Sequence, residues 1–273
     1  MTDHEFDTPH PLPLHVQIGR GRVDLTAADT TRSLVEVTGP GAEEVEVHLS
    51  GDQLNVIQPS RSGFLRDRQV TVRITVPSGS APAVRTGSAD VHLSGVVGDT
   101  EIRTGSGDVR IEVVDGPALV ETGSGDVAID EARGPLRLKS GSGDLVVGHA
   151  AAPVAASTGS GDVRIDTSDG PVVTKTGSGD MVIQHAASDI GWQTGTGDLA
   201  VQRVERGQVT AKSASGDIVL GVPPRLPVWT DMHSTTGDVS SDLEGVGEPA
   251  PGADHLEVRA TTATGDIRLR RAD

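Results

Sequence analysis

The residues of this sequence that could most clearly take part in chemistry are aspartates that recur at a nearly constant spacing. Nine intervals separate them; the first six are 18 residues each and the last three are 19, 21 and 28. Carboxylates stacked in this way repel one another unless each binds a cation or accepts hydrogen bonds. They could therefore form either a calcium-binding array or a ladder of turn caps. The ten members are Asp90, Asp108, Asp126, Asp144, Asp162, Asp180, Asp198, Asp217, Asp238 and Asp266.

We interpret these aspartates as turn caps. The repeat resembles the calcium-binding β-roll, whose Gly-Gly-x-Gly-x-Asp coil also has about 18 residues. Here, however, Asp directly follows the second Gly, and the opposite turn is Gly-Pro without carboxylates, as at Gly116-Pro117. A β-roll ion needs oxygen ligands from successive turns on both of its sides. We therefore expect each Asp to accept backbone N–H groups of its own turn, and we expect no calcium.

Other reactive residue types form no site that the sequence reveals. His149 and His185 share one position in the repeat but lie two coils apart, with Thr167 between them, which is too far for one metal ion. Cysteine is absent, so disulfides and thiol chemistry are excluded. We predict no metal-binding, cofactor-binding or catalytic residue.

Acidic pairs on the expected outer surface raise the alternative of a carbohydrate-active enzyme, because glycosidases work with two carboxylates. Such enzymes on β-helices also need aromatic platforms and a cleft, whereas this chain has two Phe, two Trp and no Tyr. Arg110 and Arg164 lie between the paired acids, so we interpret the pairs as solvated surface and predict a protein that is not an enzyme. The pairs are Asp108/Glu112, Asp126/Asp130 and Asp162/Asp166.

A second column, five residues before each aspartate, is rich in basic side chains and contains all three lysines of the chain. Each of its members precedes an inward Thr or Ser, so we expect it to point outward. A row of cations could attract an acidic protein partner, or it could only keep a flat β surface soluble. The candidate partner face consists of Arg85, Arg103, Lys139, Lys175 and Lys212.

The two columns imply the elements that position them. The residue before each Asp is Gly, except at Ala89, and Gly suits a tight turn with positive φ. Residues one and three after most aspartates are apolar, as at Val109 and Ile111, which predicts a strand with one buried face. A second alternating strand precedes each turn. The period predicts an all-β fold, a single-stranded parallel β-helix (β-solenoid) of about ten 18-residue coils with two short strands each.

The second strand also predicts part of the core. Leu138 and Trp192 fall in one inward column. Trp192 needs small neighbours there, and the repeat places Thr174 and Ala211 beside it in the adjacent coils.

The repeat is regular in only part of the chain. We predict a disordered tail over residues 1–11, an N-terminal β cap of irregular coils over 12–80, and a regular β-solenoid over 81–273, together one continuous domain. The wide last interval predicts a loop insertion at 244–253. The final strand ends at Arg270 and Arg271, and we expect its charges to protect an exposed last coil from edge pairing.

Composition limits the partners and the compartment. The formal net charge of −16 argues against nucleic acid and anionic membranes as partners. The first residues lack the basic and apolar regions of a signal peptide, and no apolar run could span a bilayer. We therefore expect no direct membrane insertion and a cytoplasmic location. Twenty arginines against three lysines indicate a high-GC bacterial genome.

The repeat Thr-Gly-Ser-Gly-Asp-Val-x-Ile, entered through Val-Thr-Val-Arg-Ile-Thr-Val-Pro-Ser-Gly-Ser at residues 70–80, resembles a known family. It is similar to the bacterial "putative adhesin" family, a domain of unknown function also called toast-rack β-helix proteins, over roughly residues 12–270. The resemblance implies a single-stranded parallel β-helix. Many members are attached to membrane segments in cell-envelope stress systems and others stand alone in actinobacteria, and no catalytic residues transfer from the family.

Three functions fit these observations. The first is a non-enzymatic scaffold that presents flat, repetitive faces to a protein partner, with a link to the cell envelope implied by the resemblance. The alternative is a surface adhesin or polysaccharide-binding β-helix, and the third is a β-helical carbohydrate-active enzyme.

Overall fold

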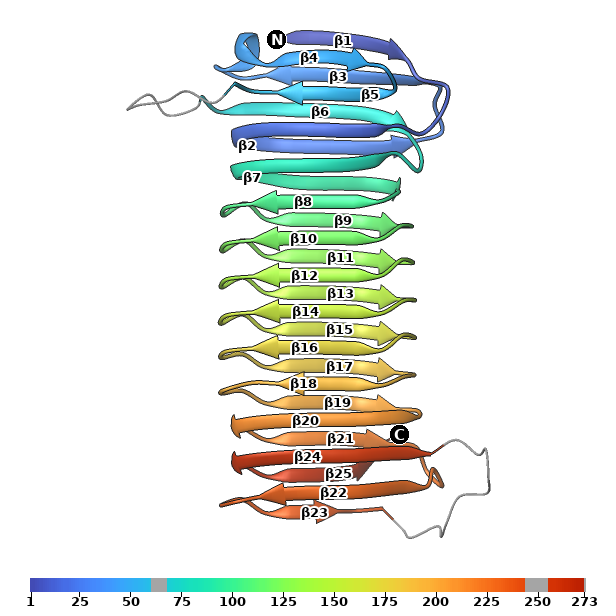
Figure 1. Cartoon of the computed structure of the whole chain (residues 1–273), viewed down its shortest axis with the longest axis vertical. Helices are drawn as coiled ribbons and strands as arrows, with labels where there is room; N and C mark the ends of the chain where they lie inside the picture. Colours follow the sequence, from blue (N-terminus) through green and yellow to red (C-terminus); the bar gives the residue numbers. More distant parts are fainter. Residues whose placement is uncertain (60–67, 244–254, 273) are drawn as a thin grey trace. The chain divides into compact units, whose positions relative to one another are not determined.

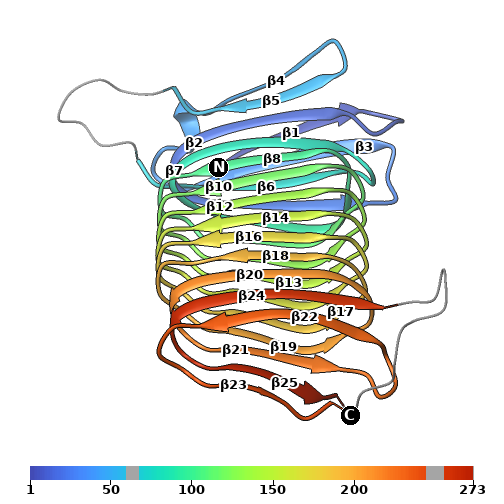
Figure 2. The same ribbon diagram turned by 60° about the horizontal axis from the view of Figure 1, so that its bottom comes forward.

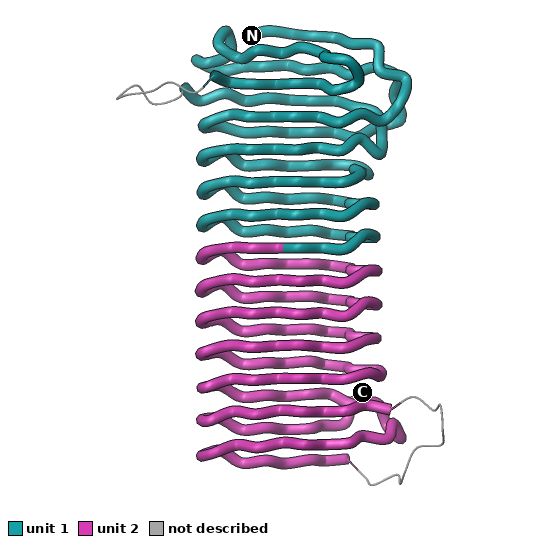
Figure 3. Tube along the Cα trace, in the orientation of Figure 1, with its two compact units in different colours: residues 1–137 teal, residues 138–273 magenta. Residues whose placement is uncertain are grey.

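The structure, a computed structural model, describes residues 1–59, 68–243 and 255–272. The described residues form 25 strands and a single short 3₁₀ helix, η1. The chain divides into two compact units, Met1–Arg137 and Leu138–Asp273, and we describe each by itself (Figure 3). The all-β, parallel β-solenoid fold predicted from the sequence is confirmed. The predictions of one continuous domain and of its boundaries stay predictions, and the predicted loop at 244–253 lies outside the described residues.

In the regular coils, β8 to β11 in unit 1 and β13 to β21 in unit 2, the strands follow the chain from one coil to the next (Figure 1). In unit 1 the elements are β1 (Thr2–Asp7), β2 (Pro13–Ala28), β3 (Arg32–Thr38), η1 (Ala42–Glu44), β4 (Glu46–Ser50), β5 (Gln53–Ile57), β6 (Val70–Pro77), β7 (Ala81–Val97), β8 (Thr100–Thr104), β9 (Val109–Val114), β10 (Ala118–Thr122) and β11 (Val127–Ala132). The boundary between the two units falls within strand β12 (Leu136–Ser140). In unit 2 the strands are β13 (Leu145–Ala150), β14 (Val154–Thr158), β15 (Val163–Ser168), β16 (Val172–Thr176), β17 (Met181–Ala186), β18 (Ile190–Gln193), β19 (Leu199–Val204), β20 (Gly207–Ser215), β21 (Ile218–Val222), β22 (Val228–Ser234), β23 (Val239–Ser241), β24 (Leu256–Thr264) and β25 (Ile267–Arg271).

In the regular coils each strand pairs in parallel with the equivalent strand of the neighbouring coil, so the coils have two faces. In unit 2 the even-strand face contains β14, β16, β18, β20, β24 and β22, and the odd-strand face contains β13, β15, β17, β19, β21, β25 and β23. The register stacks like residues on like, for example Val163 on Leu145 and Met181 on Val163. This stacking is what turns a sequence period into columns of side chains.

The core is a thin layer of aliphatic side chains between the two faces. Strand after strand alternates buried and outward residues, as the period of two requires. Leu138 is buried, and Trp192 is only 2% exposed. Thr174 and Ala211 flank Trp192 in the register, so the predicted small neighbours are confirmed.

The predicted positive φ explains only some of the turn glycines: it occurs at Gly197, Gly216 and Gly265 but not at Gly107. At Gly107 and Gly125 the backbone is not in the left-handed region; a Cβ there would instead lie 1.9 and 2.0 Å from a carbonyl oxygen of the preceding coil. Real Cβ atoms essentially never approach that closely. Glycine is therefore required because successive turns stack backbone on backbone.

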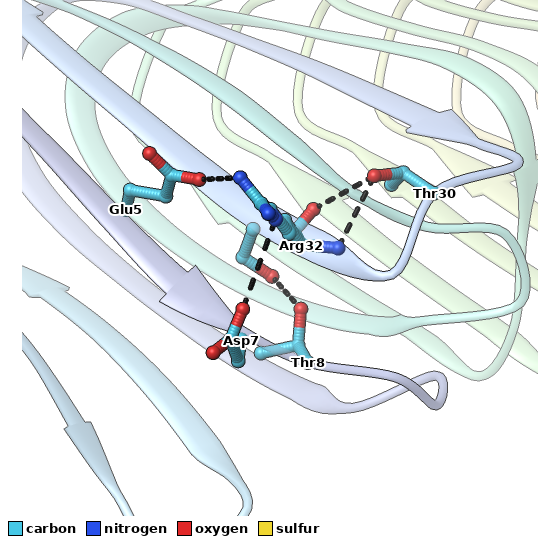
Figure 4. Close-up of polar contacts among 6 residues, drawn as sticks. Glu5, Asp7, Thr8, Thr30 and Arg32 are labelled. Carbon is cyan, nitrogen blue, oxygen red and sulfur yellow. Dashed lines mark hydrogen bonds and ion pairs between the residues drawn. The ribbon is translucent and has the colours of Figure 1, made fainter.

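The predicted disordered tail over residues 1–11 is wrong for most of its length. Strand β1 pairs antiparallel with β3, which pairs antiparallel with β6. Arg32 of β3 contacts Glu5 at 2.6 Å and Asp7 at 3.8 Å, and the hydroxyls of Thr8 and Ser33 lie 2.8 Å apart (Figure 4). A polar segment is held here because pairing to a neighbouring strand satisfies its backbone groups.

The last coils of unit 2 do not follow chain order. Strand β24 pairs with both β20 and β22, and β25 pairs with both β21 and β23 (Figures 1 and 2). The coil formed last in the sequence is therefore inserted between the two coils that precede it. The expectation that Arg270 and Arg271 protect an exposed last coil is wrong, because their strand is paired on both sides.

Candidate functional site

The aspartate column forms a hydrogen-bonded ladder. The Oδ1 atom of Asp90 accepts the backbone N–H of Asp108 at 3.1 Å, and that of Asp108 accepts the N–H of Asp126 at 3.0 Å. In unit 2 the same contact measures 2.7–2.9 Å at every step. In spatial order these steps join Asp144, Asp162, Asp180, Asp198, Asp217, Asp266 and Asp238.

The ladder differs from the expectation in one respect: each carboxylate accepts an N–H of the next coil and not of its own turn. The cap within the turn comes from the hydroxyl four residues before the aspartate. Thr122 accepts the N–H of Gly125 at 2.9 Å, and Thr158 accepts that of Gly161 at 3.0 Å. The two polar columns thus have different roles: the hydroxyl column closes each turn, and the aspartate column joins successive coils.

In the ladder the carboxylates have a structural role, because they bind backbone N–H groups. One oxygen of each joined aspartate is occupied by a backbone N–H, which offsets the repulsion between stacked charges. Within the described ranges, no group of three or more His, Cys, Asp or Glu side chains is arranged to hold a metal ion.

The other candidate residues are not brought together into a reactive site. His149 lies 2.9 Å from Asp169, and His185 lies 3.2 Å from Glu205, so each histidine contacts an acid of its own. A similar contact in unit 1 joins Arg133 to Glu131 at 2.8 Å, and this hydrogen bond raises the pKa of Arg133 above its ordinary value.

The acidic pairs considered for glycosidase chemistry also have their own contacts. Asp130 lies 3.6 Å from Arg110, and Asp166 lies 2.9 Å from Arg164. Glu112 accepts the backbone N–H of Gly95 at 2.8 Å. These carboxylates are therefore placed as the sequence suggested, in contact with arginines and backbone on an exposed surface.

The basic column behaves differently in the two units. In unit 1, Arg103 lies 2.9 Å from Glu101 and 3.2 Å from Glu121, while Arg85 lies 3.7 Å from Glu101. Two glutamates thus balance the two arginines, and this part of the column is close to neutral.

In unit 2 the basic column keeps unbalanced charge. Lys175 and Lys212 are exposed on the even-strand face and are joined in the register through Gln193. Across the described part of the chain, neither ammonium group has an ion-pair or hydrogen-bond partner. Lys139 is also exposed but has a polar interaction. We call Lys175 and Lys212 the lysine pair.

The sequence did not single out the coil of β22 and β23. Trp229 is 59% exposed there and Val239 is 44% exposed. A hollow of about 410 Å³ is lined by Trp229, Thr230, Asp231, Glu257, Val258 and Arg259. The available signal was the lengthened spacing around Asp238, together with Ser241 in place of an apolar residue.

Comparisons with known proteins found distant likenesses among solved structures. A solved structure from Parabacteroides distasonis, described as a "putative lipid binding protein", is 13% identical, with 98% of this chain and 96% of that chain covered and a TM-score of 0.46. A "putative adhesin" from Bacteroides fragilis is 12% identical, with 98% and 96% covered and a TM-score of 0.42. No curated protein matches the chain. None of the helices in the described ranges is long and apolar enough to cross a membrane.

The family model for Toastrack DUF4097 matches residues 15–270. The match covers nearly the whole repeat region and the irregular coils before it. The resemblance carried by the Thr-Gly-Ser-Gly-Asp repeat is thereby confirmed, and the chain belongs to the Toastrack DUF4097 family.

Proposed function

We propose that this chain is a non-enzymatic β-solenoid scaffold that binds an acidic protein partner through the even-strand face of unit 2. The observation that carries the proposal is the lysine pair. Lys175 and Lys212 are exposed and have no charged partner among the described residues, whereas Arg85 and Arg103 of the same column are balanced by glutamates.

Electrostatics explains why such a pair suits binding better than stability. The two lysines lie two coils apart, about 10 Å at ~4.8 Å per coil. That distance is comparable to the Debye length of ~8 Å at physiological salt, so they repel each other weakly. Removing exposed charges of this kind changes the free energy of unfolding by at most about 1 kcal/mol. Their attraction for an acidic surface acts mainly on the association rate.

The surrounding surface favours a flat contact. Beside the basic column the even-strand face presents the small residues Ala155 and Gly191 and the exposed Val173. A partner could therefore approach the backbone closely, with apolar contact beside the cations. The acids and histidines of the odd-strand face have partners of their own, which supports binding over catalysis.

The test compares two double variants that remove the same amount of charge. Lys175→Gln with Lys212→Gln removes the lysine pair, and Arg164→Gln with Arg268→Gln removes two exposed cations from the odd-strand face. Proteins recovered from an extract of the source cells are identified by mass spectrometry for wild type and both variants.

We expect the lysine variant alone to lose a partner of acidic composition, and we expect raised salt to release that partner from wild type. If both variants recover the same proteins at the same salt, the lysine pair serves only solubility and the proposal fails. Circular dichroism and thermal melting confirm that each variant keeps its fold.

A further inference from the structure

The coil of β22 and β23 has a free edge in unit 2. Among the described residues, β22 pairs only with β24, and β23 pairs only with β25. One side of each strand therefore carries backbone N–H and C=O groups without a strand partner. Such an edge is a template for a further strand.

The side chains of this edge leave apolar surface in the open. Val239 occupies an inward position, in register with the fully buried Ile267, yet it is 44% exposed. Trp229 of β22 is 59% exposed beside the hollow that β22 and β24 line. An added strand with alternating apolar residues would cover both kinds of surface.

The aspartate ladder ends at this edge. Asp238 donates its N–H to Asp266 at 2.9 Å, but among the described residues its own carboxylate accepts no N–H. At every preceding step of unit 2 that carboxylate contact is made. A strand running parallel to β22 would reach the turn at Asp238 and could supply the next N–H.

Charge identifies the kind of strand. Asp231 and Asp238 have no ion-pair partner among the described residues, and Arg259 is already paired with Glu257 at 2.6 Å. A second copy meeting this edge would bring its own Asp231 and Asp238 against these, which like-charge repulsion disfavours. We propose that the β22 edge binds an extended basic peptide segment of a protein partner as an added parallel strand.

This site goes beyond the scaffold function proposed above. It lies on an edge and takes a basic segment, whereas the lysine pair lies on a face and takes an acidic one. Failure at one site therefore leaves the proposal for the other intact.

The probe is a labelled peptide as long as β22, with alternating Lys and Val and blocked ends, titrated into the full chain and followed by fluorescence anisotropy. Two matched probes are used. A Lys-Pro peptide has the same charge but adds poorly to a sheet, because every second residue lacks an N–H and has its φ fixed at about −65°, away from strand geometry. A Glu-Val peptide can add but has the wrong charge. Emission of Trp229 provides a second readout, since Trp192 is buried.

Four variants locate the binding. Asp231→Asn with Asp238→Asn removes the edge charges, and Asp166→Asn with Asp169→Asn removes two charges on side chains about half exposed elsewhere in unit 2. Trp229→Ala removes the exposed ring, and Thr230→Lys adds a cation to the edge. We expect the first pair to weaken Lys-Val binding about fivefold, as for two lost surface charge pairs, and the matched pair to leave it unchanged.

We further expect weaker binding of Lys-Pro, no binding of Glu-Val, a blue shift of Trp229 emission with Lys-Val, and loss of binding in Thr230→Lys. Equal binding of Lys-Pro would show mere attraction to an acidic protein and would overturn it. So would binding that survives both Trp229→Ala and Thr230→Lys. Dimerisation of the free chain that Thr230→Lys abolishes would assign the edge to a second copy and would also overturn it.

Discussion

Replacing Gly161 by alanine tests the idea that the turn glycines are required for space. A Cβ at Gly161 would lie 2.1 Å from the carbonyl oxygen of Gly143 in the preceding coil and 3.1 Å from the backbone nitrogen of Asp144. Both atoms belong to the backbone, so no side chain can rotate away. The two turns must therefore separate by about 1 Å before the oxygen reaches ordinary contact distance.

That separation also affects the aspartate ladder. The Asp162 N–H donates to Asp144 Oδ1 at 2.8 Å, and about 1 Å more would carry it beyond hydrogen-bond range. Overpacking costs about 1–3 kcal/mol and the lost hydrogen bond about 1 kcal/mol. Alanine also stabilises the fold by about 0.4–1 kcal/mol, because it lowers the conformational entropy of the unfolded chain. The expected net loss of unfolding free energy is about 1–3.5 kcal/mol.

Gly191→Ala is the matched control. Gly191 lies within β18, and a Cβ there would meet Val173 Cγ2 at 3.6 Å, an ordinary contact. The change to the unfolded chain is the same in both variants, so it cancels in the comparison. Urea unfolding followed by emission of the buried Trp192 measures both. If Gly161→Ala falls within about 0.5 kcal/mol of Gly191→Ala, the stacking argument is wrong.

Three further predictions concern the core and the ladder. The Thr174 hydroxyl is buried without a hydrogen-bond partner among the described residues, so Thr174→Val should raise the free energy of unfolding by about 1 kcal/mol. In contrast, Thr158→Val removes the hydroxyl that accepts the Gly161 N–H and should lower the free energy of unfolding by about 1 kcal/mol. Leu138→Ala should cost about 2–5 kcal/mol in urea unfolding, and a loss under about 1 kcal/mol would contradict its inward placement. Millimolar calcium should leave the melting temperature unchanged; a calcium-dependent rise would show that the ladder binds the ion.

The sequence predicted positions within a coil well, because each position repeats. The period placed Trp192 inward with Thr174 and Ala211 beside it, and the structure confirms that environment. It did not predict which polar groups form hydrogen bonds between coils. The repeat shows that every coil has an aspartate, but not that Asp144 binds the N–H of Asp162, because that contact depends on the offset between turns.

The first residues were missed for a related reason. Strand β1 alternates partly buried and exposed residues without an apolar set, since its positions are filled by Thr2, His4 and Phe6. Its order comes from pairing with β3 and from contacts such as Arg32 with Glu5. Neither interaction leaves a periodic signal in a single sequence.

The candidate binding surfaces were predictable in part. The lysine column was visible, and its spacing places Glu121 one coil from Arg103. The spacing could not show that Glu101 and Glu121 contact Arg103 while Lys212 has no such partner among the described residues. Charge balance depends on side chains from neighbouring coils. The difference in charge balance between the two parts of the column therefore appears only in three dimensions.

The inverted order of the last coils follows from the composition of their inward columns. Strands β24 and β25 offer Leu256, Val258 and Leu269, which are fully buried because neighbours cover them on both sides. Strands β22 and β23 offer Thr230 and Ser241 at the corresponding positions, and both remain exposed.

Burying a hydroxyl without a partner costs about 1–3 kcal/mol, whereas burying a leucine gains a similar amount. The coil with polar inward residues is therefore the more stable choice for the end of the stack, where water reaches it. The chain can adopt this order because the intervals after Asp198 lengthen to 19, 21 and 28 residues. A polar residue at an inward position, next to a lengthened interval, is thus a sequence signal for a terminal coil.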